Sequence, residues 1–206
     1  MAYNRFTIEE LKAQFGIQIH ETADFFMPVT PVASSDLLLA TLHENVPLAL
    51  ANSTEKARSE MIIAPILIEV RRQLQRSVSL FSGIEFNVDP ERGLVGVCDY
   101  LFSLSAEQLT LEAPVVAIVE AKNENIKQGI GQCIAEMIGA ALFNARRNNP
   151  IAIVYGVVTT GNNWKFLRLV ENTVYIDVTE YYIKEIDKIV GILLFMMRHP
   201  QAASTD

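Results

Sequence analysis

The chain is poor in the residues that build disulfide scaffolds, zinc sites and membrane-spanning helices. Its 206 residues include two cysteines, Cys98 and Cys133, and three histidines, with no CxxC pair or Cys/His cluster. A disulfide framework or structural zinc site is therefore not expected. The longest apolar runs, 151–158 and 189–197, are far shorter than the roughly 20 residues of a transmembrane helix. Because charged residues also stand where a signal peptide would be apolar, we expect a cytoplasmic protein with no membrane partner.

Positive charge is scarce as well, which bears on nucleic-acid partners. Lys and Arg number 17 against 24 Asp and Glu, giving a net charge of −7. Proteins that bind duplexes usually neutralise phosphates with Lys and Arg. The distribution of charge matters more than its sum, however, and arginines cluster at 71–76 and 146–147. Carboxylates gathered around a metal ion would also make a metal-free protein look acidic, so a nucleic-acid role stays open.

Hydrophobic residues, by contrast, make up half of the chain, enough for one domain with a sizeable core. Thr7–Glu10 forms a capping box that predicts a short helix ending near Gly16. Residues 21–33, with two prolines, indicate a loop, and residues 34–45 a second short helix. We therefore expect the chain to divide into three parts along its sequence.

These parts are an N-terminal helical extension over residues 1–50, the main domain over 51–200 and a disordered tail over 201–206. From residue 54 the hydrophobic pattern becomes regular. It predicts a helix over 54–75 kinked at Pro65, strands at 78–88, 94–104 and 114–122, a helix at 126–148, strands at 151–160, 164–170 and 173–178, and a final helix at 179–199. The fold class is therefore α/β, a mixed β-sheet flanked by helices.

Charged residues stand at the ends of two of the predicted strands. Asp99 ends the segment VGVCD, and Glu120 and Lys122 end the segment VVAIVEAK. Residues two apart in a strand point to the same face, so Glu120 and Lys122 emerge together. A strand that has simply reached the surface, with an ordinary ion pair, would show the same local pattern. Because desolvating an unpaired charge is costly, a functional site is the other interpretation.

The whole arrangement resembles the PD-(D/E)XK nuclease superfamily. The resemblance spans about residues 54–170 and consists of an acidic residue on a helix, a hairpin, Asp99 and Glu120-Ala121-Lys122, then a helix. The segment TEKARSEMIIAPILIEVRRQL is also similar to the first helix of type I restriction-subunit nuclease domains. The resemblance implies a restriction-endonuclease-like fold with an αβββαβ core, whereas residues 1–50 match no part of that fold. It also implies a Mg²⁺- or Mn²⁺-dependent endonuclease that hydrolyses phosphodiester bonds in DNA.

The resemblance also assigns roles to individual residues. Asp99, Glu120 and the Ala121 carbonyl would be metal ligands, and Lys122 would position or activate the attacking water. Such oxygen ligands suit Mg²⁺, which lowers the pKa of a bound water and stabilises charge on the scissile phosphate. An acid on the first helix often completes these sites. Helical phase at 100° per residue favours Glu60 as this fourth catalytic residue, with Glu55 as the alternative because Pro65 can reset the phase.

Three features leave other interpretations open. Many relatives carry a Gln four residues before a Tyr on the helix after the motif; here Gln128 and Gln132 are candidates, but Glu136 takes the Tyr position. That substitution and the acidic composition favour an alternative, a catalytically inactive nuclease-fold protein that binds nucleic acid or protein. The run 189–197 is apolar on every side, which indicates either a helix covered by the N-terminal segment or a subunit interface. Since two-fold dimers are the commonest assemblies, we expect a homodimer.

Overall fold

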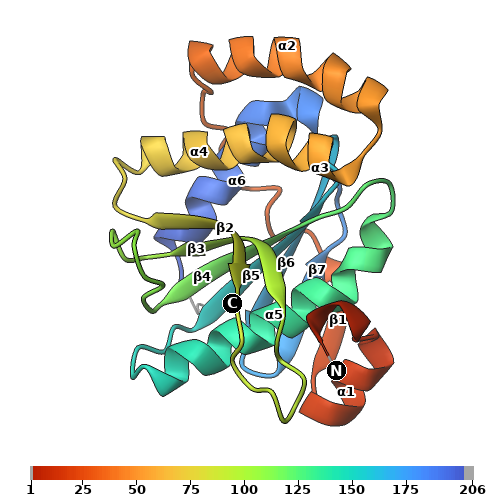
Figure 1. Ribbon diagram of the computed structural model, residues 1–206, viewed down its shortest axis with the longest axis vertical. Helices are drawn as coiled ribbons and strands as arrows, with labels where there is room; N and C mark the ends of the chain where they lie inside the picture. The colour runs from red at the N-terminus through yellow and green to blue at the C-terminus, as the bar shows by residue number, and fades with distance from the viewer. Residues whose placement is uncertain (1, 202–206) are drawn as a thin grey trace.

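A mixed β-sheet organises the chain, and helices cover both of its faces (Figure 1). The computed structural model describes residues 2–201, without the side chains of residues 22 and 23; the expected disordered tail, apart from residue 201, lies outside this range. The strands are β1 (Gln18–Ala23), β2 (Ser79–Glu85), β3 (Val97–Ser103), β4 (Val115–Ala121), β5 (Ile153–Thr159), β6 (Asn163–Val170), β7 (Thr173–Asp177) and β8 (Tyr181–Tyr182). Their order is β1-β7-β6-β5-β4-β3-β2, with β8 beside β6. The pairs β4·β5 and β1·β7 are parallel and the others antiparallel.

The helices divide between the two faces of the sheet. They are α1 (Ile8–Phe15), α2 (Asp36–Asn52), α3 (Glu55–Arg58), α4 (Ala64–Gln73), α5 (Ile126–Arg146) and α6 (Ile186–Arg198), joined by the short turns η1 (Tyr3–Arg5), η2 (Ser59–Ile63) and η3 (Ile183–Glu185). One apolar core lies under α5 and α1, and a second lies under α2, α4 and α6 (Figure 1). The predicted mixed sheet flanked by helices is thus confirmed. No helix within residues 2–201 combines the length and apolarity needed to cross a bilayer.

The N-terminal residues contribute a strand to the sheet, whereas only helices and a loop were predicted for them. The capping box of Thr7 and the helix end at Gly16 are present as expected. Gln18–Ala23 then forms β1, although residues from 21 onward were expected to be a loop. This polar strand has no strong pattern of its own; it pairs with β7, far along the chain, and Gln18 N donates to Asn172 O at 2.9 Å. Pairing across the fold, not local periodicity, creates it.

The predicted 54–75 helix is interrupted by a widened turn. Thr54 caps α3 as expected, and Ser59–Ile63 then forms a π-helical turn before α4. Pro65 has no N–H to donate, so the Met61 carbonyl loses its usual helical partner. Asn45 Nδ2 fills that place at 2.9 Å. The extra residue in this turn shifts the phase of everything before it relative to α4.

Two further helix boundaries differ from prediction. The helix expected at 34–45 continues to Asn52 through Pro47. The last helix starts at Ile186 instead of 179, because Tyr181–Tyr182 pair with Asn163 and Trp164 as β8.

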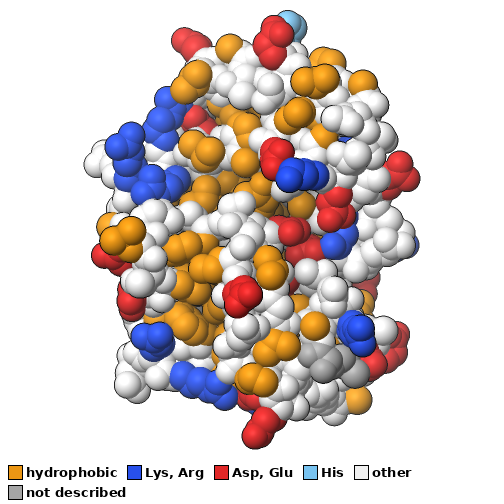
Figure 2. Space-filling model, in the orientation of Figure 1, with side chains coloured by type: hydrophobic (Ala, Val, Ile, Leu, Met, Phe, Trp, Pro, Cys, Tyr) orange, Lys and Arg blue, Asp and Glu red, His pale blue; other side chains and the backbone are white. Residues whose placement is uncertain are grey.

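The apolar helix α6 is buried within the chain itself. Val32 N donates to Asp187 O at 2.9 Å, and a Cβ on Gly191 would lie 2.5 Å from the Thr30 carbonyl oxygen. The N-terminal segment therefore covers α6, as one of the two sequence interpretations anticipated. A homodimer stays a prediction that α6 no longer supports. Apolar side chains instead reach the surface over α2 (Figure 2), where the exposed leucines are Leu37, Leu39, Leu48 and Leu50.

Candidate functional site

The candidate site lies where β3 and β4 part. Their ladder ends at the pair Tyr100↔Val119. In the gap beyond, Asp99 Oδ2 accepts a hydrogen bond from the Ala121 N–H at 2.8 Å. On its other side β4 stays attached to β5, since Lys122 N donates to Thr159 O at 2.8 Å. The backbone of β4 therefore holds the Asp99 carboxylate at the level of Glu120.

Glu120 and Lys122 form a largely buried pair on the α5 side of the sheet. Glu120 is 1% exposed, and the Lys122 ammonium donates to its Oε1. The other carboxylate oxygen, Oε2, is buried without a hydrogen-bond partner. Lys122 lies close against α5, because a Cβ on Gly129 would be only 3.0 Å from its Cγ. The structure thus brings Asp99, Glu120 and Lys122 together.

The electrostatics of these groups depend on burial and on one another. Burial, then the charge of Asp99, raises the pKa of Glu120 to about 8, although Lys122 opposes the shift. Burial also raises the pKa of Asp99 in spite of the Ala121 hydrogen bond. For Lys122, burial alone would lower the pKa, but the Glu120 carboxyl outweighs it and the pKa is raised. A raised carboxyl pKa is what two acids sharing a site should show.

A cavity of about 370 Å³ opens beside this group. Its lining comes from α3 and η2, from β2 and from the ends of β3 and β4: Glu55, Lys56, Ser59, Glu60, Ser82, Gly83, Asp99, Tyr100 and Ala121. Tyr100 fixes the wall of the cavity, because its hydroxyl lies 2.7 Å from Ser59 Oγ. Both acids proposed from the first helix therefore reach the same cavity as Asp99.

Glu55 and Glu60 differ in how strongly they act on the site. Glu60 pairs with Lys56 at 3.6 Å, and its side chain is 61% exposed. The charge of Glu55 instead contributes to raising the pKa values of Asp99, Glu120 and Lys122. Because Glu55 is exposed as well, only the effect of its charge on these groups distinguishes it from Glu60, the residue that helical phase favoured. The phase count assumed an uninterrupted α-helix, and the π-helical turn at Ser59–Ile63 breaks that assumption.

On α5 the two glutamines are clearly separated. Gln128 is exposed, whereas Gln132 Oε1 accepts from Lys122 Nζ at 3.5 Å. Gln132 Nε2 donates in turn to Glu136 Oε1 at 3.0 Å, and Glu136 is fully buried. No role for Glu136 was predicted from the sequence. The helical pattern could have indicated its burial, because Glu136 lies on the face of α5 that is made of small residues, including Gly129. This face packs closest to the sheet.

The arginine clusters largely serve the structure. Arg71 Nε donates to Val78 O at 3.0 Å, and Arg72 pairs with the buried Glu69. Arg146 Nη2 lies 3.1 Å from Asp89 Oδ2. Arg71 and Arg146 thus tie helix ends to neighbouring segments, and Arg72 pairs with a carboxylate on its own helix.

The residues at the site fit a hard divalent cation. Asp99 and Glu120 offer carboxylate oxygens, one of which, Glu120 Oε2, is buried and unpartnered. The 2–201 range contains no cluster of three or more His, Cys, Asp or Glu side chains arranged to hold a metal. Mg²⁺ and Mn²⁺ need only one or two carboxylates with a carbonyl and waters, so this small oxygen set suits them better than zinc.

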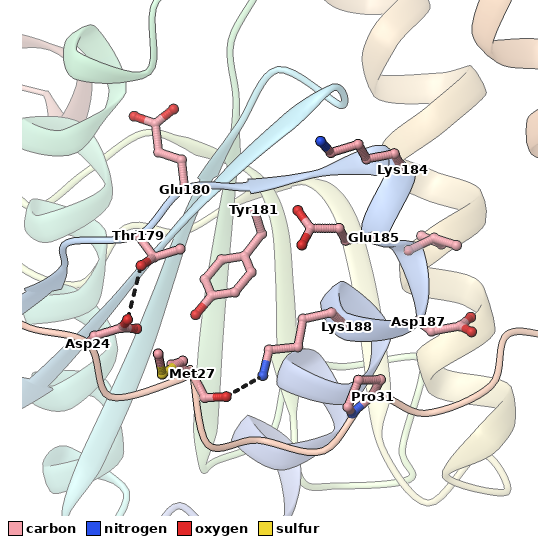
Figure 3. A pocket seen from close by; sticks show the side chains of 11 residues that line it. Asp24, Met27, Pro31, Thr179, Glu180, Tyr181, Lys184, Glu185, Asp187 and Lys188 are labelled. Carbon is pink, nitrogen blue, oxygen red and sulfur yellow. Dashed lines mark hydrogen bonds between the residues drawn. The ribbon is translucent and has the colours of Figure 1, made fainter.

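A larger cavity, of about 530 Å³, lies between the N-terminal segment, β8 and α6 (Figure 3). Figure 3 shows its two sides joined by the bonds that hold the segment in place. Thr179 donates to Asp24 at 3.2 Å, and Lys188 donates to the Met27 carbonyl at 2.7 Å. None of the three residues at the β3–β4 ends lines this cavity. Its polar groups anchor the cover of α6 and do not form part of the candidate site.

No protein-family model matches the chain, and a search of curated proteins found no match either.

Proposed function

We propose that this protein is a metal-dependent nuclease of the PD-(D/E)XK type, with a restriction-endonuclease-like fold, that hydrolyses phosphodiester bonds in DNA. One observation carries the proposal: the diverging ends of β3 and β4 bring two carboxylates and a lysine to one point. Asp99 and Glu120, with the Ala121 carbonyl, would hold Mg²⁺ or Mn²⁺. Supporting this, Asp99 and Ala121 both line the adjoining cavity.

The chain's own residues divide the work at this site. A bound cation would supply a water of lowered pKa and would offset charge on the scissile phosphate. The Ala121 N–H keeps the Asp99 carboxylate in place without help from a mobile side chain. The Glu120 carboxyl favours the charged ammonium of Lys122, as its raised pKa shows. Lys122 would therefore act as a hydrogen-bond donor that positions the water or a phosphate oxygen, and not as a neutral base.

A catalytically inactive binding module is the second candidate. The net charge of −7 and the Glu136 in place of a Tyr favour it. The two candidates differ in a single readout, because a binding module would retain nucleic acid in the presence of Mg²⁺ without cleaving it.

The nuclease proposal is tested by incubating the purified protein with supercoiled plasmid, linear duplex, single-stranded DNA and RNA. We expect cleavage of DNA with Mg²⁺ or Mn²⁺ and none after EDTA, because the oxygen ligands bind no substrate phosphate without the cation. Gel electrophoresis of time points measures the rate. Cleavage that survives EDTA would contradict the proposal, and binding without cleavage would support the second candidate.

The contribution of the first helix is tested by neutralising its two acids separately. We expect Glu55→Gln to lower kcat/KM by about 10- to 100-fold, in the range typical of groups that support metal ligands. Glu60→Gln is expected to change it by less than about threefold, because exposed pairs such as its bond to Lys56 contribute little. The two variants are matched in chemistry and lie on the same cavity wall. A larger loss for Glu60→Gln would restore the assignment made from helical phase.

A further inference from the structure

A chain of hydrogen bonds runs from the candidate site into the core behind it. Glu120 accepts from the Lys122 ammonium, Lys122 donates to Gln132 Oε1, and Gln132 Nε2 donates to Glu136 Oε1. Gln132 and Glu136 lie one turn apart on α5. Glu136, at the end of the chain, is 0% exposed and touches no cavity wall of the site. Glu120 and Lys122 do not line that cavity either, but Glu136 lies one residue further from Asp99 along the hydrogen bonds and contacts Lys122 only through Gln132.

The two ends of Gln132 have different neighbours. A glutamine amide has a carbonyl oxygen that accepts and an NH₂ group that donates, while a lysine ammonium only donates. Gln132 therefore faces Lys122 with its oxygen only if its NH₂ group finds an acceptor on the other side. Within this buried region Glu136 Oε1 is that acceptor, at 3.0 Å. Without it, turning the amide would remove the acceptor that holds Lys122.

The surroundings of Glu136 favour a neutral acid. Burial, followed by the charge of Glu120, raises its pKa well above the ordinary value. Its second oxygen, Oε2, is buried without a partner and so can carry the proton while Oε1 accepts. A neutral acid there is cheaper to bury than a carboxylate, and it does not draw the Lys122 ammonium away from Glu120.

We propose that Glu136 is a positioning residue, which fixes the amide of Gln132 so that its oxygen faces and holds the Lys122 ammonium. The geometric half of this proposal stands on the hydrogen bonds alone. Its catalytic half rests on the proposed nuclease function, in which Lys122 acts on the water or the phosphate.

The geometric half is tested in the intact protein without any substrate. The side-chain amide of Gln132 is observed by ¹H–¹⁵N NMR and assigned by its disappearance in Gln132→Met. We expect a hydrogen-bonded, slowly exchanging amide proton in the wild type and in Glu136→Gln, whose carbonyl oxygen can still accept. In Glu136→Leu that protection should be lost. A protected amide that persists in Glu136→Leu would overturn the proposal.

The catalytic half is tested by separating kcat from KM on DNA. We expect Glu136→Leu to lower kcat by about 10- to 100-fold with KM unchanged, because the residue supports the site without touching substrate. Glu136→Gln should stay within about threefold of wild type. Equal losses in both variants would overturn the role of the acceptor. Leucine leaves the Gln132 NH₂ group without its acceptor, which costs about 1–3 kcal/mol, so thermal melting checks that the variant is still folded. A loss of kcat in a well-folded variant is then informative.

Gln132→Met removes the amide that lies between Lys122 and Glu136, and Gln132 is only half-buried. This variant should reproduce the loss of kcat. It keeps the catalytic test decisive if Glu136→Leu folds poorly. An unchanged kcat in Gln132→Met would overturn the proposal. If the wild type cleaves no nucleic acid, the proposed function fails, and the NMR comparison still decides the geometry.

Discussion

Lys122→Ala is expected to lower the rate of metal-dependent DNA cleavage by about 10³-fold, at the upper end of the range for removal of one positioned hydrogen-bond donor at the reacting group. The ammonium is the only cation that bonds directly to Glu120 among the described residues, and Gln132 fixes it from the other side. No neighbouring side chain can replace it, since Lys56 is exposed and paired with Glu60. The rate is measured under single-turnover conditions with Mg²⁺, so that binding and chemistry are separated.

The same substitution should leave the protein folded. Removing one partner of a buried pair costs about 3–5 kcal/mol when it strands a charge. Here Glu120 has a pKa of about 8 with Lys122 present and takes up a proton more readily without it, so no buried charge is stranded. The free energy of unfolding should therefore fall by only about 1–3 kcal/mol. Lys127→Ala is the matched control, because Lys127 is an exposed lysine close by on α5. Cleavage that continues in Lys122→Ala, or falls equally in Lys127→Ala, would remove Lys122 from the mechanism.

Stability should fall as pH rises from about 4.5 to about 8, because of Glu120. Its ordinary pKa is 4.5, and burial beside Asp99 raises the folded-state pKa to about 8. Between these values the folded protein holds a proton that the unfolded chain has released. The free energy of unfolding therefore decreases with pH, at most by about 1.4 kcal/mol per pH unit for one group. The raised pKa values of Asp99 and Glu136 act with the same sign.

Urea unfolding of wild type and Glu120→Gln across this pH range measures the effect. The variant should show a clearly shallower decline, since glutamine does not titrate, while Glu124→Gln, at a nearby exposed position, should follow the wild type. Mg²⁺ should stabilise the wild type more near pH 8 than near pH 6, because it competes with the proton on Glu120. Identical pH profiles for wild type and Glu120→Gln would show that Glu120 is not the group whose proton is lost.

The local sequence was sufficient to predict the centre of the sheet and the motif within it. The runs 114–122 and 151–160 are apolar and bounded by turn residues, so β4 and β5 follow from burial on both faces. The 3.6-residue period of α5 and the capping box of Thr7 are equally local. Asp99, Glu120 and Lys122 stood out because charges interrupt such runs only at their ends. What the residues do chemically stays a proposal.

Contacts between distant segments decided the rest of the fold and of the candidate site. A periodic hydrophobic pattern shows which face of a helix or strand is buried, but not which segment covers that face. The polar strand β1 exists through its pairing with β7, and α6 is covered by a segment that looked like a free loop. Pro65 signalled a break in the first helix, but only the tertiary structure shows that Asn45 donates to the Met61 carbonyl and that a π-helical turn shifts the phase of Glu55 and Glu60 relative to α4. Glu136 likewise lies on a helix face of small residues, but that pattern did not reveal what its carboxyl would contact. Only the packing of α5 against the sheet buries Glu136 and places its carboxyl where it accepts a hydrogen bond from the Gln132 amide.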